Sequence, residues 1–159
     1  MDNALKKTVL RLFTYGLYAA TTKQGDDVGV MTVNWLTQCS FDPPLLALAV
    51  EADSHSRQVI EASGTFALNL YESGQRELAG SLGRTFRKHP EKITEVAWQP
   101  GPATGSPLLE NALGWVECKV TSSLPTGDHI LFVAEVVEAG LNREGVPLTL
   151  KETGFKYAG

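Results

Sequence analysis

The feature that most constrains the fold is a succession of short β-like runs, each closed by turn residues. Residues 16–22, "GLYAATT", end at the polar turn "KQGDD", and a second run, Gly29–Gln38, follows directly. Pro43 and Pro44 then bar a helix and interrupt any ladder of strand hydrogen bonds. The next run, "LLALAV" at 45–50, is too short for a stable helix and predicts a strand buried on both faces.

The middle of the chain combines helix signals with one more strand. "DSHSRQVIEASG" predicts a short helix, for which Asp53, Ser54 and Ser56 are all candidate N-caps and Gly64 is the expected end. "TFALNL" alternates apolar positions between two faces, which indicates a strand. "SGQRELAGSLG" predicts another short helix, ending near Gly83.

The last third predicts a hairpin of two long strands. "GWVECKVTSS" and "HILFVAEVVEAG" flank the turn "LPTGD", whereas the preceding segment "RTFRKHPEKITEVAWQPGPATGSP" is expected to be mostly loop. A final short strand is expected near Leu148–Leu150. About six strands with short flanking helices predict a mainly β, antiparallel β-barrel, because closure removes exposed edges. A parallel α/β sheet is disfavoured, since most connections lack a crossover helix.

Length and charge limit the class of protein. The 159 residues contain no repeat and no linker, which predicts a single domain over 1–159. No stretch approaches the ~20 apolar residues of a membrane span, and "MDNALKKTVLRLFTYG" does not read as a signal peptide, so we expect a cytoplasmic protein with no membrane partner. A net charge of −4 without a dense basic run argues against nucleic-acid binding. The dispersed cysteines and histidines predict no metal site.

The run before the Pro-Pro pair is a candidate ligand wall. It interleaves apolar residues with short polar side chains, namely Thr32, Asn34, Thr37, Gln38 and Ser40. Such side chains suit a planar heterocycle that carries carbonyl and ring-nitrogen acceptors. Trp35 could supply apolar surface beside it, although a core role is the commoner fate of a strand tryptophan. A half-solvated strand and an ordinary turn remain the alternatives.

Two further clusters could serve the same ligand. Residues 54–57 stand where a strand gives way to a helix start, and free N–H groups and the helix dipole there suit a phosphate. Plain N-capping is the alternative. Arg84, Arg87 and Lys88 could add positive charge to that phosphate, or could form a solvated loop face.

The third cluster is "GDH" at 127–129. Asp128 could orient the imidazole of His129 at the mouth of a site, or the three residues could be an ordinary turn entering a strand. The chain has no GxSxG, so hydrolase chemistry is not indicated, and no GxGxxG after a strand, so a Rossmann nicotinamide site is not expected.

Taken together, these segments resemble a known family. "GVMTVNWLTQCSFDPPLLALAV", "SHSRQVIEASGTFALNLYE", "GSPLLENALGWVECKV" and "PTGDHILFVAEVVEAG" occur in the order found in the flavin reductase-like family of FMN-binding split barrels. The chain is most similar to the flavoredoxin type and to the flavin reductase module of some flavodiiron proteins and rubredoxin fusions. "YGLYAATTKQGD" and "KETGFKYAG" resemble the same subgroup. The resemblance implies a six-stranded split barrel, as a homodimer with FMN, or alternatively FAD, at the subunit interface.

The resemblance also implies the site residues. The flavin-binding positions would be Thr32, Val33, Asn34, Trp35, Thr37, Ser40, Ser54, His55, Ser56, Arg57 and Asn69, with Arg84 or Arg87 as the phosphate partner. Asp128 and His129 would lie near the reactive side of the flavin, where they would position a nicotinamide or stabilise the reduced flavin.

The implied function is an NAD(P)H:flavin reductase that transfers hydride from reduced nicotinamide to N5 of FMN. The first rival is a flavoredoxin-like electron carrier, whose redox partner would be a separate protein, since the chain has neither rubredoxin cysteine pairs nor flavodiiron metal ligands. The second rival is a heme-binding split barrel with His129 or His55 as axial ligand, which would leave the phosphate-side hydroxyls without a purpose.

Overall fold

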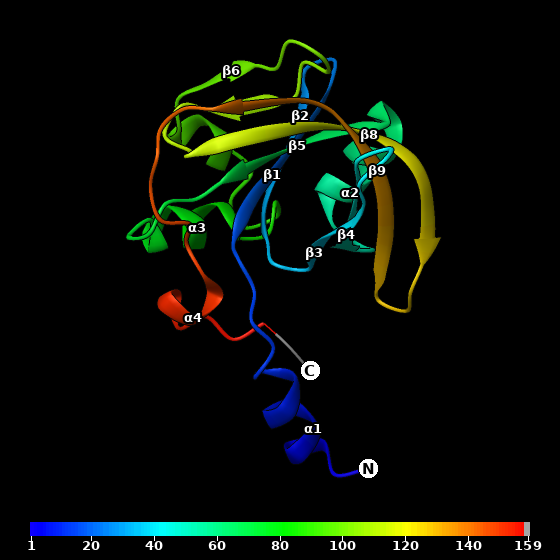
Figure 1. Ribbon diagram of the computed structural model, residues 1–159, viewed down its shortest axis with the longest axis vertical. Helices are drawn as coiled ribbons and strands as arrows, with labels where there is room; N and C mark the ends of the chain where they lie inside the picture. Colours follow the sequence, from blue (N-terminus) through cyan, green and yellow to red (C-terminus); the bar gives the residue numbers. More distant parts are fainter. Residues whose placement is uncertain (158–159) are drawn as a thin grey trace.

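Seven antiparallel strands form the main sheet of the computed structural model, which describes residues 1–157 (Figure 1). Their order in the sheet is β2-β1-β5-β8-β9-β4-β3. The strands are β1 Tyr18–Gln24, β2 Asp27–Val33, β3 Leu36–Ser40, β4 Leu45–Glu51, β5 Thr65–Leu70, β8 Gly114–Pro125 and β9 His129–Leu141. The predicted mainly β, antiparallel fold is confirmed.

The polar run before the Pro-Pro pair is two strands rather than one. The sequence predicts a single strand over Gly29–Gln38, but the chain leaves β2 at Val33 and enters β3 at Leu36. β2 pairs with β1, and β3 pairs with β4, so these consecutive strands stand at opposite ends of the sheet order. The two residues between them, Asn34 and Trp35, carry the chain from one end of the sheet to the other. For this reason the sheet has seven strands where the sequence suggests six.

Aromatic and aliphatic side chains from the central strands fill the barrel interior. Leu48, Phe66, Leu68 and Phe132 are essentially without solvent exposure, and burial of such a side chain contributes about 1.5–3 kcal/mol each. The prediction that β4 is buried on both faces is wrong: Leu48 and Val50 are buried, while the other β4 residues are half-buried or exposed. One reason is that the end of β4 faces the cavity described below rather than packed side chains.

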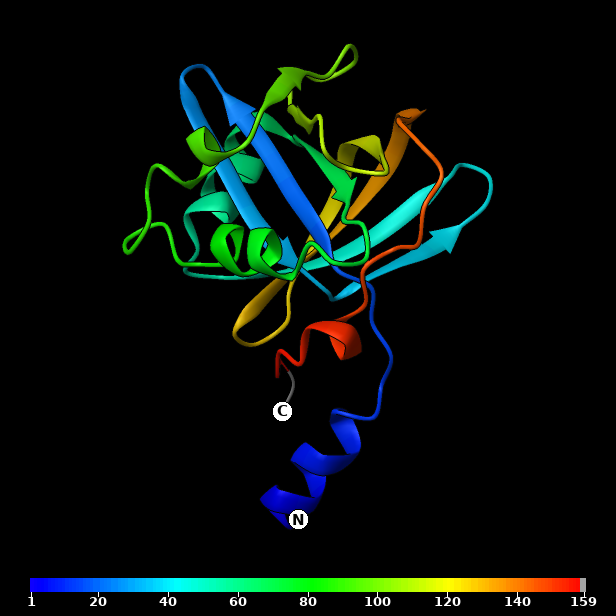
Figure 2. The same cartoon turned by 90° about the vertical axis from the view of Figure 1, so that its left-hand side faces the viewer.

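The two predicted helices are present beside the barrel (Figure 2). α2 spans His55–Ser63, and Ser54 is its N-cap, since its Oγ accepts a hydrogen bond of 3.2 Å from the backbone N–H of Arg57. Gly64 ends it in the left-handed conformation, with φ of 69°, which glycine adopts without steric cost. α3 spans Arg76–Leu82 and ends at the predicted residue, Gly83.

The predicted long loop holds a short ribbon that the sequence did not indicate. It contains the 3-10 helix η1, Lys92–Glu95, and the strand β6, Trp98–Pro100, which pairs with β7, Pro107–Leu109. The buried carboxylate of Glu117 on β8 accepts hydrogen bonds from two backbone N–H groups of the loop between β6 and β7. A buried carboxylate needs such donors, and these bonds hold the ribbon to the barrel.

The two ends of the chain differ from expectation. In place of a strand at Leu148–Leu150, Pro147 and Thr149 make isolated β-bridges. Thr149 then caps α4, Leu150–Thr153, because its side chain accepts a hydrogen bond from the N–H of Glu152.

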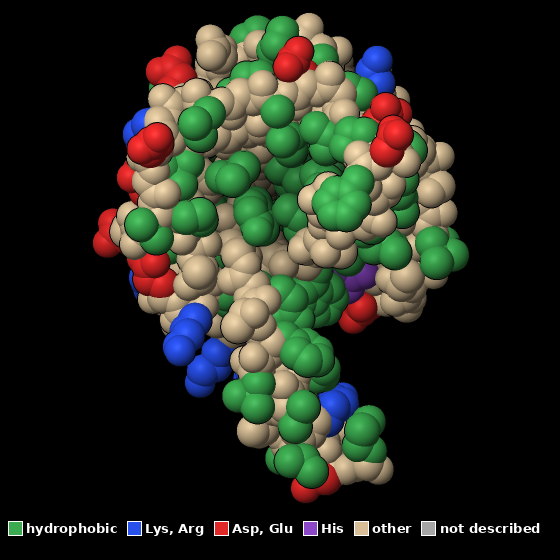
Figure 3. Space-filling model, in the orientation of Figure 1, with side chains coloured by type: hydrophobic (Ala, Val, Ile, Leu, Met, Phe, Trp, Pro, Cys, Tyr) green, Lys and Arg blue, Asp and Glu red, His purple; other side chains and the backbone are tan. Residues whose placement is uncertain are grey.

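At the N-terminal end the helix α1, Asn3–Leu10, projects away from the barrel with no buried residue, and hydrophobic side chains lie along it (Figure 3). None of the helices within residues 1–157 combines the length and apolar character needed to cross a membrane.

Candidate functional site

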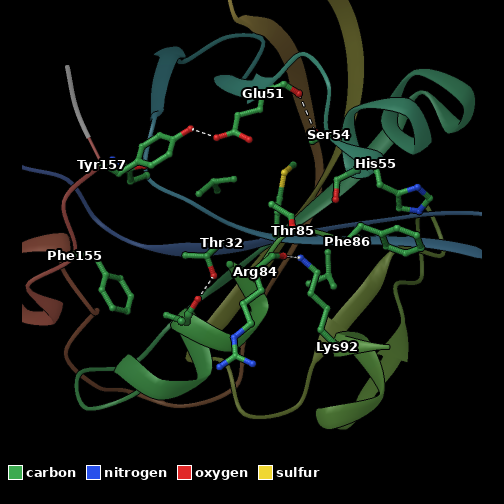
Figure 4. A pocket seen from close by; sticks show the side chains of 18 of the residues that line it. Thr32, Glu51, Ser54, His55, Arg84, Thr85, Phe86, Lys92, Phe155 and Tyr157 are labelled. Atoms are coloured by element: carbon green, nitrogen blue, oxygen red, sulfur yellow. Dashed lines mark hydrogen bonds between the residues drawn. The ribbon is translucent and has the colours of Figure 1, made fainter. Parts of the chain in front are cut away.

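A cavity of about 1000 Å³ opens beside β2 (Figure 4). Its walls come from β2, the end of β4, the start of α2, the segment from α3 to η1, and the tail that follows α4. Segments far apart in the sequence therefore meet at one place. Of the predicted site residues, it is lined by Thr32, Val33, Asn34, Trp35, Ser54, His55, Ser56, Arg84 and Arg87.

The polar wall contains one side chain with an unused donor. Asn34 is 5% exposed, and its Nδ2 has no hydrogen-bond partner within residues 1–157. Thr32 differs, because its hydroxyl already bonds to the carbonyl of Ala79 at 2.6 Å and to the hydroxyl of Tyr71 at 2.9 Å. A buried amide without a partner is costly. Asn34 is therefore a polar side chain of this wall whose donor the described residues leave without a partner.

The start of α2 forms a second wall of the cavity. Ser54 donates to the carbonyl of Glu51 at 2.8 Å and also caps the helix, so the capping role and the place in the cavity coexist. His55 stacks on Phe86 with a centroid distance of 3.8 Å, and its Nε2 lies 2.9 Å from a carboxylate oxygen of Asp27. These contacts fix the His55 ring at the cavity wall.

The segment after α3 gives this end of the cavity its positive charge. Arg84, Arg87 and Lys88 all line it, and so does Lys92, which sequence reasoning missed. The Nζ of Lys92 donates to the carbonyls of Leu82 and Arg84 at 2.7 and 2.6 Å. Burial lowers the pKa of Lys92 to about 8. In the sequence "HPEKITE" this lysine is indistinguishable from a solvated one.

The opposite end of the cavity is closed by the C-terminal tail. The hydroxyl of Tyr157 donates to a carboxylate oxygen of Glu51 at 2.7 Å, and its ring meets that of Trp35 edge-on at 5.3 Å. Burial, followed by the hydrogen bond to Glu51, raises the pKa of Tyr157. Phe155 also lines the cavity. The one sequence signal for this end is the resemblance of "KETGFKYAG" to the family.

Asp128 and His129 lie behind this end rather than in the cavity wall. The Nδ1 of His129 lies 2.7 Å from a carboxylate oxygen of Asp128, and its Nε2 lies 3.0 Å from the hydroxyl of Tyr157. The hydrogen bond with His129 lowers the pKa of Asp128. The imidazole also contacts Trp35 at 4.5 Å. With both ring nitrogens bonded, His129 presents no free nitrogen as a heme ligand, and the predicted role toward a nicotinamide stays a prediction.

Three predicted contact residues lie outside the cavity wall. Thr37 and Ser40 belong to β3, an edge strand, where Thr37 is exposed and Ser40 half-buried. The guanidinium of Arg57 is bonded to the carbonyl of Ala52 at 2.7 Å and to Glu61 at 2.6 Å. Their contacts with a flavin stay predictions.

Asn69 is also away from the cavity, in the closed interior. Its Nδ2 lies 3.1–3.3 Å from the hydroxyl of Thr21 and the carbonyls of Ala19 and Pro107, and its Oδ1 accepts from the N–H of Leu109 at 2.8 Å. The amide thus ties β7 to β1 and β5. Its predicted role in cofactor binding stays a prediction.

Comparison with known proteins shows which family has this sequence and fold. Residues 10–159 match the family model "Flavin reductase like domain". The diflavin flavoprotein A 1 of Synechocystis sp. is 31% identical over 137 residues, which cover 86% of this chain and 24% of that protein. HsaB, the reductase subunit of a flavin-dependent monooxygenase of Mycobacterium tuberculosis, is 33% identical, with 86% of this chain and 71% of HsaB covered. The NADH:FAD oxidoreductase SgcE6 of Streptomyces globisporus has a TM-score of 0.74 and 31% identity over 81% of this chain and 76% of its own.

The chain therefore belongs to the flavin reductase-like family. This finding confirms the predicted family and split-barrel fold, and it agrees with the predicted flavin oxidoreductase. The chain spans only about a quarter of the length of the diflavin flavoprotein, so the activities of that longer protein do not transfer directly.

Proposed function

We propose that this chain is an NAD(P)H-dependent flavin reductase that binds FMN, with FAD as an alternative, in the cavity beside β2. The observation that carries the proposal is the buried Nδ2 of Asn34, a donor without a partner in a cavity wall. A flavin ring system bears carbonyl and ring-nitrogen acceptors. The relatives whose names include a monooxygenase reductase subunit and an NADH:FAD oxidoreductase support the same reaction class.

The residues present fit such a cofactor at both of its chemical ends. Asn34 would donate to the ring system, and Trp35 offers aromatic surface next to it. The N-terminus of α2, at residues 54–56, would take the phosphate together with Arg84 or Arg87, because free N–H groups and positive charge favour an anion. Lys92 adds a buried positive charge at that end.

The bound flavin would supply the chemistry that accepts hydride from the reduced nicotinamide. The chain supplies binding, orientation and exclusion of water. Asp128 holds Nδ1 of His129, which leaves Nε2 directed at the hydroxyl of Tyr157. We propose that this fixed imidazole orients the nicotinamide at the Trp35 end of the cavity.

The proposal includes a homodimer. Thr37 and Ser40 lie on the edge strand β3, outside this chain's own cavity, and would reach a flavin only across an interface with a second copy. If light scattering showed a monomer, Thr37 and Ser40 could not contact the flavin. We also propose that residues 1–159 form one flavin-binding domain and that the protein is cytoplasmic. Its reduced flavin would serve a separate monooxygenase or redox protein.

The test is anaerobic addition of NADH, and then NADPH, to FMN-loaded protein while the visible flavin band is recorded. Rapid bleaching, faster than that of free FMN under the same conditions, supports the reductase. A band that persists while FMN stays bound contradicts it and favours the electron carrier instead.

A further inference from the structure

The C-terminal tail carries a residue, Tyr157, to which the proposed function assigns no role of its own. After α4 the chain is anchored by Phe155, whose ring packs against a cluster of buried side chains that includes Tyr71 and Leu82. The centre of this ring lies 4.9 Å from the guanidinium carbon of Arg76. Two residues later Tyr157 reaches Glu51 on β4 (Figure 4). It also reaches His129 on β9, and both partners lie far from the tail in the sequence.

The hydrogen bonds of the tail beyond Phe155 come from one functional group. Within residues 1–157, the hydrogen bonds of Lys156 and Tyr157 are those of the Tyr157 hydroxyl, which donates to Glu51 at 2.7 Å and lies 3.0 Å from Nε2 of His129. Tyr157 as a whole is still 39% exposed. Its side chain is held by one exposed hydrogen bond, one part-buried hydrogen bond and an aromatic contact with Trp35, so its release costs less than unfolding of the barrel.

Tyr157 takes the surface that a ligand ring would use. The Trp35 ring contacts His129 at 4.5 Å and Tyr157 at 5.3 Å, within the range of stabilising aromatic pairs. Trp35 adjoins Asn34, whose buried Nδ2 has no hydrogen-bond partner within the described residues. With the tail in place, part of the Trp35 surface is therefore covered by the Tyr157 ring.

We propose that Tyr157 is a latch on this cavity: its hydroxyl holds the tail over Trp35, and the nicotinamide of the electron donor enters only when that hydroxyl lets go of Glu51 and His129. This proposal rests on the proposed function. It makes Tyr157 a residue that sets the affinity for the donor, since the apparent dissociation constant equals the intrinsic one divided by the open fraction.

The raised pKa of Tyr157 agrees with a latch that persists at neutral and mildly alkaline pH. Burial, the hydrogen bond to Glu51 and the negative charges of Glu51 and Asp128 all favour the protonated phenol. The hydroxyl therefore remains a donor to Glu51.

The test compares wild type with Tyr157→Phe, which keeps the ring and removes the hydroxyl. Tyr15→Phe is the matched control, because Tyr15 is half-buried and does not line the cavity. The first measurement is titration of NAD⁺, which binds without turnover, into FMN-loaded protein. We expect Tyr157→Phe to bind NAD⁺ about tenfold more tightly, which is the scale of two modest hydrogen bonds. FMN affinity and the melting temperature should be unchanged in Tyr15→Phe. In Tyr157→Phe the melting temperature should fall by a few degrees, because the native state loses the hydrogen bonds of the latch, and FMN affinity should change less than NAD⁺ affinity.

The second measurement needs no flavin. Acrylamide quenching of tryptophan emission in the apoprotein should increase in Tyr157→Phe and not in Tyr15→Phe, and the increase should vanish when Trp35→Phe is added. Equal NAD⁺ affinity and equal quenching would overturn the latch, even if NADH bleaches the flavin and the proposed function stands. Weaker NAD⁺ binding in Tyr157→Phe would also overturn it, since the hydroxyl would then be part of the donor site. A failure of the proposed function shows differently, as wild-type protein whose bound FMN does not respond to NADH.

Discussion

Two buried asparagines in this barrel have opposite environments. Asn69 is fully buried with both its Nδ2 and its Oδ1 hydrogen-bonded, whereas Asn34 is 5% exposed and its Nδ2 is unpaired within the described residues. Both are buried asparagines in or beside strands, so burial and residue type do not distinguish them. The difference is that Asn69 lies beneath the β6–β7 ribbon and Asn34 lies in the wall of a cavity.

Buried polar side chains that stabilise the fold can thus be distinguished from those that bind a ligand. A buried amide that is fully bonded inside the chain stabilises the fold, and removal of it leaves several partners unsatisfied. A buried amide with a free donor costs stability unless a ligand supplies the acceptor. The pair therefore predicts that substitution of Asn69 affects folding, and that substitution of Asn34 affects binding.

The largest effect is expected for Asn69→Ala. The substitution leaves the carbonyl of Ala19 and the N–H of Leu109 without their side-chain partner. The carbonyl of Pro107 loses its bond from Asn69 and keeps the one from the hydroxyl of Thr21. We expect a loss of about 3 kcal/mol in the free energy of unfolding. Urea unfolding of the apoprotein measures it. An unchanged midpoint would show that Asn69 does not fasten the ribbon.

The next effect is expected for Asn34→Ala, and it falls on the ligand. FMN affinity should decrease about tenfold, or about 1.4 kcal/mol, because the donor to the flavin is lost. The apoprotein should be at least as stable as wild type, since the substitution removes a buried donor that has no hydrogen bond within the described residues. A destabilised apoprotein with unchanged FMN affinity would reverse the roles of the two asparagines.

A smaller effect is expected at the positively charged end as the pH rises. Lys92, whose pKa burial lowers to about 8, is charged below that pH and neutral above it. A neutral amine still has two N–H groups for the carbonyls of Leu82 and Arg84, so the loss is one of charge beside the phosphate. FMN affinity should fall about threefold between pH 7 and pH 9.5, measured by fluorescence titration. Lys92→Met should show weak affinity throughout and no such decline; a parallel decline would assign the effect to another group.

The smallest effect is expected for Phe86→Leu. The variant loses the ring stacked on His55 but keeps apolar bulk and leaves the contact between His55 and Asp27 in place. The stacked pair contributes about 0.5 kcal/mol, so FMN should bind about twofold more weakly by the same titration. A loss as large as that of Asn34→Ala would place the main recognition at this end instead.

The sequence predicts those features that depend on neighbouring residues. Alternation and turn residues predict most strands, and Gly64 and Gly83 end their helices as expected. The break at Asn34–Trp35 is not predictable from neighbours, since "MTVNWLTQC" reads as one extended run. It arises because β2 and β3 pair with strands at opposite ends of the sheet.

Only those parts of the cavity wall that belong to patterns of neighbouring residues are predictable from the sequence. Thr32 to Trp35 and Ser54 to Ser56 belong to local patterns and do line it. Tyr157 meets Glu51 across 106 positions of the chain, and Lys92 acquires its altered pKa only through burial in the fold. Such residues carry no local signal, so long-range contacts have to reveal them.

The most direct test follows the side-chain amides of Asn34 and Asn69 in one experiment. In a ¹⁵N-labelled sample, the side-chain NH₂ resonances of Asn34 and Asn69 can be assigned with Asn34→Asp and Asn69→Asp and followed as FMN is added. The account predicts that the Asn34 resonances shift strongly as the flavin takes its free donor, while those of Asn69 stay in place. Bound FMN with unmoved Asn34 resonances would contradict the assignment of this cavity wall to the flavin.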